Sequence, residues 1–360
     1  MEIIVKTPRE IEKIAASHIE EVLEHNCKVK PRPWGLLGVV LVDNTEDKRK
    51  AAKLISENVP EASQVLVVEK EVKPDIEEIC KAAAKVALEH LKQGETFAIR
   101  TTKRGKHEFS TIDVNVAAGR AVQEATGAEV NLDYPDKAIY IEIFQNTAAI
   151  CVVPGTEERK KMKPGKPLVL DILRRISVIQ MPYTGPLDGV YRMGVRIGRA
   201  IQCFELGELY IAHYKPVTAE ELHTFLKGVL EGRDSRYRIQ VKSYGRPVHK
   251  VPVYVYEMYQ LVRHIKGKPV IVTDPRGEYL THVKDKIAEL FSKGSKVYVL
   301  IGAREGIPVG IFRFADLVVD LIPQITISTD YAPVATVIGI VAALEETGAL
   351  PKFTGKRKRK

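Results

Sequence analysis

Two loops near the C-terminal end combine residue types that could bind a cofactor. The first, residues 302–308, follows the apolar stretch 296–301 and carries Arg304 and Glu305 between two glycines. The second, residues 323–330, is polar. Glycine lets a backbone turn tightly or approach a ligand closely, and loops after strand ends bind nucleotides and cofactors in open α/β sheets. The same pattern also fits two surface loops of an ordinary βαβ core.

The elements that would position these loops alternate between strand and helix. Apolar, β-branched segments predict strands at residues 176–181, 208–214, 269–273, 296–301 and 317–321. Apolar residues at helical spacing predict helices at residues 187–204, 219–230, 278–293 and 332–346. Helices of this length between strands predict a doubly wound α/β domain with a mostly parallel sheet. The last helix is apolar on nearly all sides, so it must be buried in its own domain or against a partner subunit.

Several common site motifs are missing from this half of the chain. No GxGxxG follows the first strand, which disfavours dinucleotide binding of the Rossmann kind, and no glycine-rich GK[ST] loop indicates an ATPase. The four cysteines, Cys27, Cys80, Cys151 and Cys203, are scattered without a CxxC pair. They are interpreted as buried thiols, and no metal site is expected.

Composition bounds the class of protein. A chain of 360 residues is expected to form two or three domains. A hydrophobic content of 45% with 28% charged residues is typical of soluble globular proteins, and the charged N-terminus lacks a signal-peptide core, so cytoplasm is the expected location. Residues 352–360 supply six of the nine net positive charges. We define residues 351–360 as the basic tail. Its charge is compatible with nonspecific phosphate binding and equally with a solvated chain end.

The N-terminal half also alternates. Residues 1–75 show strand, helix, strand, helix and strand in turn, which predicts a small ferredoxin-like α+β module serving as an accessory platform. Residues 76–155 predict a helix, a strand, a basic turn, a second helix capped by Ser110, and two closing strands. Residues 156–175 contain prolines, glycines and a basic run, as expected of a linker to the domain at 176–350.

The second of these segments resembles a THUMP domain. The resemblance rests on the run FAIRTTKRGKHEFSTIDV at residues 97–114, on Gly119, and on the V-N-L-x-x-P-D pattern at residues 130–136. THUMP domains are RNA-binding modules of tRNA-modifying enzymes, where they grip the acceptor end. The expected phosphate contacts are the basic side chains of Arg100, Lys103, Arg104, Lys106 and, from the linker, Lys160. Without the resemblance, these residues also fit a solvated loop of mixed charge.

The two C-terminal loops resemble the last motifs of the SPOUT superfamily, the trefoil-knotted RNA methyltransferases that use S-adenosylmethionine. Residues 301–308 match a glycine loop of the IG-x-x-G kind, and residues 321–333 match a threonine-rich loop followed by a helix of small residues. The family's Arg-Thr-Glu-Thr-Ala run corresponds here to the different sequence Ser-Thr-Asp-Tyr-Ala at residues 328–332.

Two other enzyme types carry THUMP domains, and their motifs are missing. Rossmann-type base methyltransferases need an Asn/Asp-Pro-Pro-Tyr loop, for which the nearest candidate is Gln-Met-Pro-Tyr at residues 180–183. Thiouridine synthetases need a Ser-Gly-Gly-x-Asp-Ser loop, which does not occur. The knotted methyltransferase remains.

The SPOUT resemblance implies that S-adenosylmethionine lies bent among three loops, at residues 273–277, 302–308 and 322–333. Backbone groups would read much of the adenine edge. The implied cofactor-binding residues are Thr273, Pro275, Gly277, Ile301, Gly302, Gly306, Ile322, Ile327, Thr329 and Ala332. Ile322 and Ile327 also fit a plain core role.

The implied catalytic residues are Arg199, Arg304, Glu305 and Asp330. Either carboxylate could act as a base if the target atom must lose a proton, whereas positioning suffices for an unprotonated ring nitrogen. Arg304 could pin the target phosphate or base. One SPOUT branch carries a helix arginine within an Asn-x-Gly-x-x-x-Arg motif, and Arg199 fits that arginine. The Asn and Gly of the motif are missing from this chain. Arg192 and Arg196, which neighbour Arg199 on the helix, fit RNA contacts and equally fit a solvated basic face.

The sequence therefore predicts a tRNA methyltransferase dependent on S-adenosylmethionine. It would act as a homodimer on a nucleotide near the acceptor stem or D-arm, with guanosine as a candidate. The alternative is a non-catalytic RNA-binding or assembly factor with a degenerate SPOUT domain. An unrelated α/β enzyme with a basic tail is a third possibility.

Overall fold

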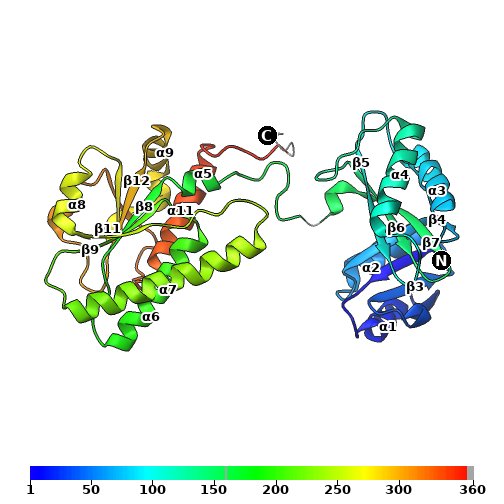
Figure 1. Ribbon diagram of the computed structural model, residues 1–360, viewed down its shortest axis with the longest axis horizontal. Coiled ribbons are helices and arrows are strands. Elements are labelled where there is room, and N and C mark those ends of the chain that lie inside the picture. Colours follow the sequence, from blue (N-terminus) through cyan, green and yellow to red (C-terminus); the bar gives the residue numbers. More distant parts are fainter. Residues whose placement is uncertain (159, 355–360) are drawn as a thin grey trace. The chain divides into compact units, whose positions relative to one another are not determined.

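The computed structural model describes residues 1–158 and 160–354, so the basic tail beyond residue 354 lies outside the described residues. The chain divides into two compact units, Met1–Lys163 and a second one that begins at Pro164 (Figure 1). Each unit is a sheet packed against helices. Among the described residues, every helix is too short or too polar to cross a lipid bilayer.

The first unit is built on one seven-stranded sheet with the strand order β2-β3-β1-β4-β7-β6-β5. The strands are β1 (Ile3–Lys6), β2 (Lys28–Pro31), β3 (Val39–Asp43), β4 (Gln64–Val72), β5 (Phe97–Lys103), β6 (Lys137–Ile143) and β7 (Ala148–Pro154). The helices are α1 (Glu12–Val22), α2 (Lys48–Asn58), α3 (Ile76–His90) and α4 (Thr111–Thr126), with 3₁₀ turns η1 (Pro33–Gly35) and η2 (Gly155–Glu157). Helices α1 and α2 share a core with β1 and β3, whereas α3 and α4 share one with β5, β6 and β7.

Strand β4 joins the two halves of this unit. It pairs antiparallel with β1 along one edge and with β7 along the other. A further hydrophobic cluster takes Ile4 and Leu66 from one half and Phe144 from the other. The expected division between residues 75 and 76 therefore falls inside one continuous sheet.

The start of α4 is built as its sequence predicts. The Ser110 hydroxyl accepts the Asp113 N–H at 3.2 Å, and the Asp113 carboxylate accepts the Ser110 N–H at 2.8 Å. This reciprocal capping box satisfies two backbone donors that would otherwise lack partners at a helix start. It fixes where α4 begins, next to the basic turn after β5.

The second unit has a six-stranded sheet with the order β10-β9-β8-β12-β11-β13, in which every pair is parallel. The strands are β8 (Ile176–Gln180), β9 (Glu208–His213), β10 (Val253–Glu257), β11 (Val270–Tyr279), β12 (Val297–Ile301) and β13 (Leu317–Asp320). The helices are α5 (Leu170–Leu173), α6 (Leu187–Cys203), α7 (Ala219–Ser243), α8 (Met258–His264), α9 (Lys284–Ser292), α10 (Val309–Phe312) and α11 (Ala332–Glu346), with the 3₁₀ turn η3 (Leu280–Val283).

Helices cover both faces of this sheet (Figure 1). Helices α6, α7, α9 and α11 pack into one core with strand residues such as Val178 and Val299. The alternate residues Ile179 and Leu300 point to the other face, where α8 and α10 cover them. The predicted doubly wound, parallel α/β domain is confirmed. Its loops at the carboxyl ends of the strands converge on one edge, where a ligand site is expected.

Two predicted helix boundaries in this unit are wrong, and a glycine in close backbone contact lies near each. A helix was expected over residues 278–293, but β11 continues to Tyr279 and α9 begins only at Lys284. A Cβ atom on Gly277 would lie 2.5 Å from the Val318 carbonyl carbon, so this glycine lets β11 return against β13. Helix α7 continues to Ser243 rather than ending at residue 230, and Gly232 lies within it, where a Cβ would be 2.0 Å from the Val195 carbonyl oxygen of α6. Strands β2 and β10 and helix α8 were not predicted, although the β-branched and aromatic residues of β10 are typical of a strand.

Candidate active site

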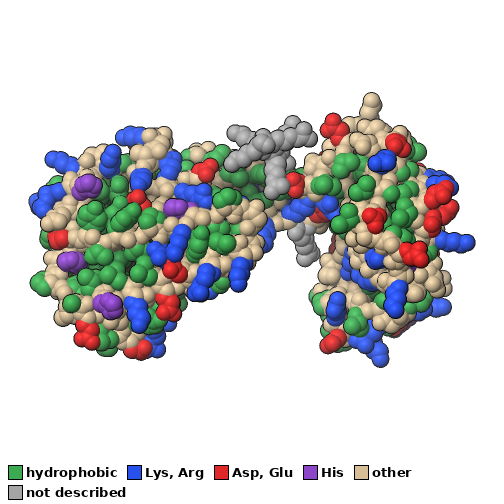
Figure 2. Space-filling model, viewed as in Figure 1, with side chains coloured by type: hydrophobic (Ala, Val, Ile, Leu, Met, Phe, Trp, Pro, Cys, Tyr) green, Lys and Arg blue, Asp and Glu red, His purple; other side chains and the backbone are tan. Residues whose placement is uncertain are grey.

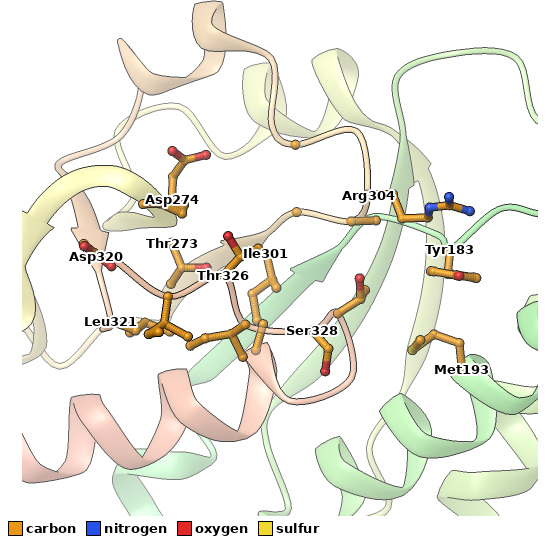
Figure 3. A pocket seen from close by; sticks show the side chains of 18 residues that line it. Tyr183, Met193, Thr273, Asp274, Ile301, Arg304, Asp320, Leu321, Thr326 and Ser328 are labelled. Carbon is orange, nitrogen blue, oxygen red and sulfur yellow. The ribbon is translucent and has the colours of Figure 1, made fainter. Parts of the chain in front are cut away.

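A cavity of about 620 Å³ opens where β12 and β13 end and where a loop interrupts β11 (Figure 3). The loop inside β11 and the loops after β12 and β13 form most of its wall. Eight of the expected cofactor residues line it: Thr273, Pro275, Ile301, Gly302, Gly306, Ile327, Thr329 and Ala332. The fold thus brings together segments that are up to 59 positions apart in the chain because parallel strands end at the same edge.

The loop after β12 makes a tight turn. The Gly306 N–H donates to the Ala303 carbonyl at 2.9 Å, and Gly306 has a φ of +71°, a left-handed conformation that side chains disfavour. A Cβ on Gly302 would lie 3.5 Å from the Gly306 Cα. The two glycines therefore pack against each other and leave the backbone of this loop at the cavity surface.

The loop inside β11 is held by an ion pair. The buried Asp274 carboxylate accepts two hydrogen bonds from the Arg276 guanidinium, at 2.7 and 2.9 Å, and a third from the Arg276 N–H. Hydrogen bonds from Arg276 lower the pKa of Asp274, so it is ionised at neutral pH. Thr273 and Pro275 line the cavity. Gly277 does not line it, since it packs on the backbone of β13 and shapes the loop instead.

The loop after β13 supplies the opposite wall. Asp320 accepts the Ile322 N–H at 3.1 Å, and the chain then turns so that Ile327 and Thr329 line the cavity while Ile322 faces solvent. The buried Asp330 accepts a hydrogen bond from the Ser328 hydroxyl at 2.7 Å. It also pairs with Arg196 of α6 at 3.3 Å, which ties the loop to that helix.

The expected catalytic residues have separate locations. Arg304 lines the cavity, and its guanidinium lies 5.8 Å from the centre of the Tyr183 ring with no acidic partner among the described residues. Glu305 points elsewhere and pairs with Lys215 at 2.8 Å. Arg199 lies on α6 and donates to the Ser235 hydroxyl of α7 at 3.5 Å. Arg304 is therefore the one member of the expected set that reaches the cavity.

Several lining residues are not among the expected catalytic and cofactor-binding residues. Met193 of α6 and Tyr183 after β8 stand at the same end as Arg304, whereas Asp274 and Asp320 lie toward the other end (Figure 3). Of these, Tyr183 is expected from sequence, since it follows a predicted strand and its ring could stack on a flipped base. Met193 is one apolar helix residue among many, and only the packing of α6 reveals it.

Most basic side chains expected to contact RNA are engaged within the first unit. Arg100 forms a bidentate ion pair with Glu158 at 2.8 and 3.3 Å, and Arg104 pairs with the fully buried Glu142 at 2.7 Å. Lys103 donates to the Phe109 carbonyl, Lys160 pairs with Glu158, and Lys106 is exposed. In the second unit, Arg192 pairs with Asp188.

The cavity can hold a nucleotide-sized ligand on backbone groups and small side chains, with the Arg304 guanidinium, which has no acidic partner among the described residues, at one end. Within the described residues, no group of three or more His, Cys, Asp or Glu side chains is arranged to hold a metal ion. The chemistry available here is binding and alignment, with Arg304 ready to hold an anionic group.

Comparisons with known proteins agree with this arrangement. Residues 170–360 match the family described as AF2226-like SPOUT RNA methylase fused to THUMP, and residues 73–153 match the THUMP domain. An uncharacterized protein from Methanocaldococcus jannaschii is 39% identical over 343 residues, which cover 94% of this chain and 93% of that protein. A probable tRNA sulfurtransferase from Methanosarcina acetivorans is 32% identical over 147 residues, covering 39% of this chain and 34% of that protein.

Among solved structures, PH1313 from Pyrococcus horikoshii is 17% identical and covers 97% of this chain and all of that one, with a TM-score of 0.37. That likeness is too weak to carry an argument. The match over residues 170–360 spans more than half of the chain, and the match to the Methanocaldococcus jannaschii protein is nearly full-length. The resemblance seen in the loop motifs is confirmed, and the chain belongs to the AF2226-like family of SPOUT RNA methylases fused to a THUMP domain.

Proposed function

We propose that this protein is an S-adenosylmethionine-dependent tRNA methyltransferase. Its second unit would bind the cofactor in the cavity formed by the loop inside β11 and the loops after β12 and β13. Its first unit would grip the tRNA so that a nucleotide near the acceptor stem or D-arm, with guanosine as a candidate, reaches the cofactor.

The observation that carries this proposal is a set of backbone N–H groups in the loop after β13 that have no partner among the described residues. The backbone N–H groups of residues 326–329 donate no hydrogen bond to another described residue, although all four residues line the cavity. Backbone donors without a protein partner are available to a ligand, and they can recognise the edge of a base without charged side chains. The glycine loop on the facing wall leaves room for that ligand.

The target nucleotide would approach at the end that carries Arg304 and Tyr183. An arginine without an acidic partner can bind a phosphate through two parallel hydrogen bonds, and a neighbouring ring offers a stacking surface. Methyl transfer then requires chiefly that the acceptor atom be aligned with the methyl group. Arg199 and Asp330 would contribute by fixing α6 against α7 and against the loop after β13.

Two features support tRNA as the substrate. The chain is 32% identical over 147 residues to a protein named as a probable tRNA sulfurtransferase, and a THUMP domain binds RNA. In the second unit, Lys and Arg side chains follow the C-terminal half of α7, where Arg238 and Lys242 are exposed (Figure 2). Such side chains can hold phosphates and make binding strongly dependent on salt.

The test is a calorimetric titration of the full chain with S-adenosylmethionine, repeated on Gly306→Trp. The indole would enter the cavity and should weaken binding at least ~100-fold, a loss of about 2.7 kcal/mol. Gly294→Trp is a matched control. Gly294 has a φ of +70° against +71° for Gly306, and a Cβ at either position meets nothing within 4 Å. Because Gly294 precedes β12, it lies at the opposite end of that strand.

Tight binding that survives in Gly294→Trp and is lost in Gly306→Trp supports the cofactor site. Nucleoside mass spectrometry of tRNA incubated with the protein then identifies the modified nucleotide. No binding by the wild-type chain, with or without tRNA, would refute the enzyme and favour the alternative of an RNA-binding assembly factor.

A further inference from the structure

A second cavity adjoins the first at the same edge of the sheet. It has a volume of about 170 Å³ and lies at the carboxyl ends of β9, β8 and β12. Ala303 and Arg304 line both cavities, so the loop after β12 is their common wall. Sites for cofactor-sized ligands usually occupy roughly 300 Å³ or more, and this cavity is therefore suited to a single ring system.

The walls of this second cavity are polar. The Glu305 carboxylate accepts hydrogen bonds from Lys215 at 2.8 Å and from the Tyr214 hydroxyl at 3.1 Å. The bond from Lys215 is the main reason that the pKa of Glu305 is lowered, so the carboxylate stays ionised at neutral pH. An ionised, doubly engaged carboxylate is a poor proton acceptor. Glu305 therefore serves to hold Lys215 and Tyr214 in position.

His213 is the better proton acceptor in this cavity. Its Nδ1 lies 3.2 Å from the Lys215 carbonyl oxygen. A carbonyl can only accept, so the proton of the neutral ring is on Nδ1, and Nε2 keeps its lone pair. Nε2 makes no hydrogen bond to any other described residue, and His213 lines the cavity. A ring whose tautomer is set in this way is the arrangement that a general base requires.

We propose, building on the function proposed above, that the second cavity receives the acceptor group of the target nucleotide and that His213 is its proton acceptor. The acceptor is a group that loses a proton, either a base N–H or a ribose hydroxyl. Its lone pair forms a bond to the methyl carbon while the carbon–sulfur bond breaks and leaves its electrons on sulfur. The proton passes to His213 Nε2. The products are S-adenosylhomocysteine, the methylated nucleotide and a protonated imidazole, which balances atoms and charge.

Several ionisable groups face His213 from the elements around it. Glu221 lies in the first turn of α7, Arg304 and Glu305 in the loop after β12, and Tyr214 and Lys215 next to His213 itself. The segment after β8 lines this cavity with Met181, Pro182 and Thr184, none of which is ionisable. Two carboxylates and two cations thus surround the imidazole, and their formal charges cancel.

The test is transfer of a labelled methyl group from S-adenosylmethionine to a mixture of unmodified tRNA transcripts. His213→Gln keeps an amide donor for the Lys215 carbonyl but cannot take up a proton. We expect kcat to fall at least ~100-fold with KM for tRNA changed less than ~3-fold, and the acid limb of the pH–rate profile to disappear. His223→Gln, an exposed position on α7 outside both cavities, is the control and should behave as wild type.

His213→Ala adds a second test because free imidazole in the buffer should restore part of its rate. A residue with a purely structural role would not be rescued in this way. Calorimetry with S-adenosylmethionine and the melting temperature report whether each variant is folded with its cofactor site intact.

The outcomes separate the two proposals. Equal rates and pH profiles for His213→Gln and wild type, while tRNA is methylated, overturn the role of His213 and leave the proposed function standing. A wild-type chain that methylates no tRNA overturns both. Mass spectrometry of the product distinguishes a methylated base from a methylated ribose.

Discussion

Glu205 shows how one carboxylate can join distant segments of the second unit. It is 1% exposed and accepts hydrogen bonds from Arg174 at 3.0 Å, from Arg246 at 2.5 and 3.0 Å, and from the His249 N–H at 3.0 Å. Burial acts to raise the pKa of Glu205, but hydrogen bonds from Arg246, His249 and Arg174 outweigh it and lower the pKa to about 2. The charged form is thus bound more tightly in the folded state.

Glu205→Gln should lower the free energy of unfolding at pH 7 by on the order of 3 kcal/mol. Because the folded-state pKa lies below the usual value of 4.5, this contribution is fully present above pH 4.5 and is lost as the pH falls toward 2. Urea unfolding at a series of pH values measures it. Glu289→Gln, an exposed carboxylate on α9, should change stability by less than ~0.5 kcal/mol. A gap between Glu205→Gln and wild type that stays constant down to pH 2.5 would contradict this account.

Single residues also mark the limit of sequence reasoning. Ser110 could be predicted as a helix cap because its partner, Asp113, is three positions away. The basic cluster of the first unit could not be interpreted in the same way. Arg100 meets Glu158 at a separation of 58 positions, and Arg104 meets Glu142 at 38. Local pattern carries no information about such pairs, so side chains that looked free for phosphates are already engaged.

The pair α6 and α7 packs unusually closely. Gly194 and Gly198 on α6 face Gly228 and Gly232 on α7, and a Cβ added at any of the four would lie 2.0 to 2.4 Å from a backbone oxygen of the other helix. Backbones can approach so closely only where both side chains are missing. The contact holds α6, and with it Met193 and Arg196, beside the loops that form the larger cavity.

Gly198→Ala should therefore lower stability by about 1–3 kcal/mol, since its methyl group would lie 2.0 Å from the Val229 carbonyl oxygen and force the helices apart. Gly189→Ala is the matched control on the same helix, where a Cβ meets nothing within 4 Å. That substitution should leave stability unchanged or raise it by roughly 0.5–1 kcal/mol. Thermal unfolding followed by circular dichroism compares the two, and equal losses would refute the close-packing argument.

At the scale of elements, the alternation of strands and helices was predictable and its boundaries were less so. The strand at β12 and the helix α11 were expected almost to the residue because both are long apolar runs with clear ends. Helix α7 exceeded its prediction because Gly232 in a charged run is typical of a helix end, whereas here it serves a contact with a distant helix. The three loops of the larger cavity could be predicted because two of them match family motifs and the third follows a predicted strand. The second cavity and His213 could not, because they depend on contacts between distant segments.

At the scale of the molecule, α11 is buried on one side only. Val337, Ile340 and Leu344 lie in the core, whereas Ile338 is 57% exposed on the other side of the helix. An exposed apolar helix face is typical of an interface, and we expect the predicted homodimer to form through it.

Ile338→Lys should then shift the protein from dimer to monomer in size-exclusion chromatography with light scattering. A lysine at the centre of an apolar contact buries a charge without a partner. Leu88→Lys on α3, where the leucine is 60% exposed, is the control and should leave the mass unchanged. A monomeric wild-type chain, or a dimer that persists in Ile338→Lys, would contradict an interface at this helix.

The continuous sheet of the first unit has a consequence for which RNA substrates would fit it. Strands β1 and β7 are hydrogen-bonded to opposite edges of β4, so points on the two halves keep a constant separation. If the N-terminal half and the THUMP half each contact an RNA, the distance between the two contacts is fixed by the sheet. An RNA would be selected by the length between its contacted features, so that lengthening a stem by one base pair would matter more than changing its sequence.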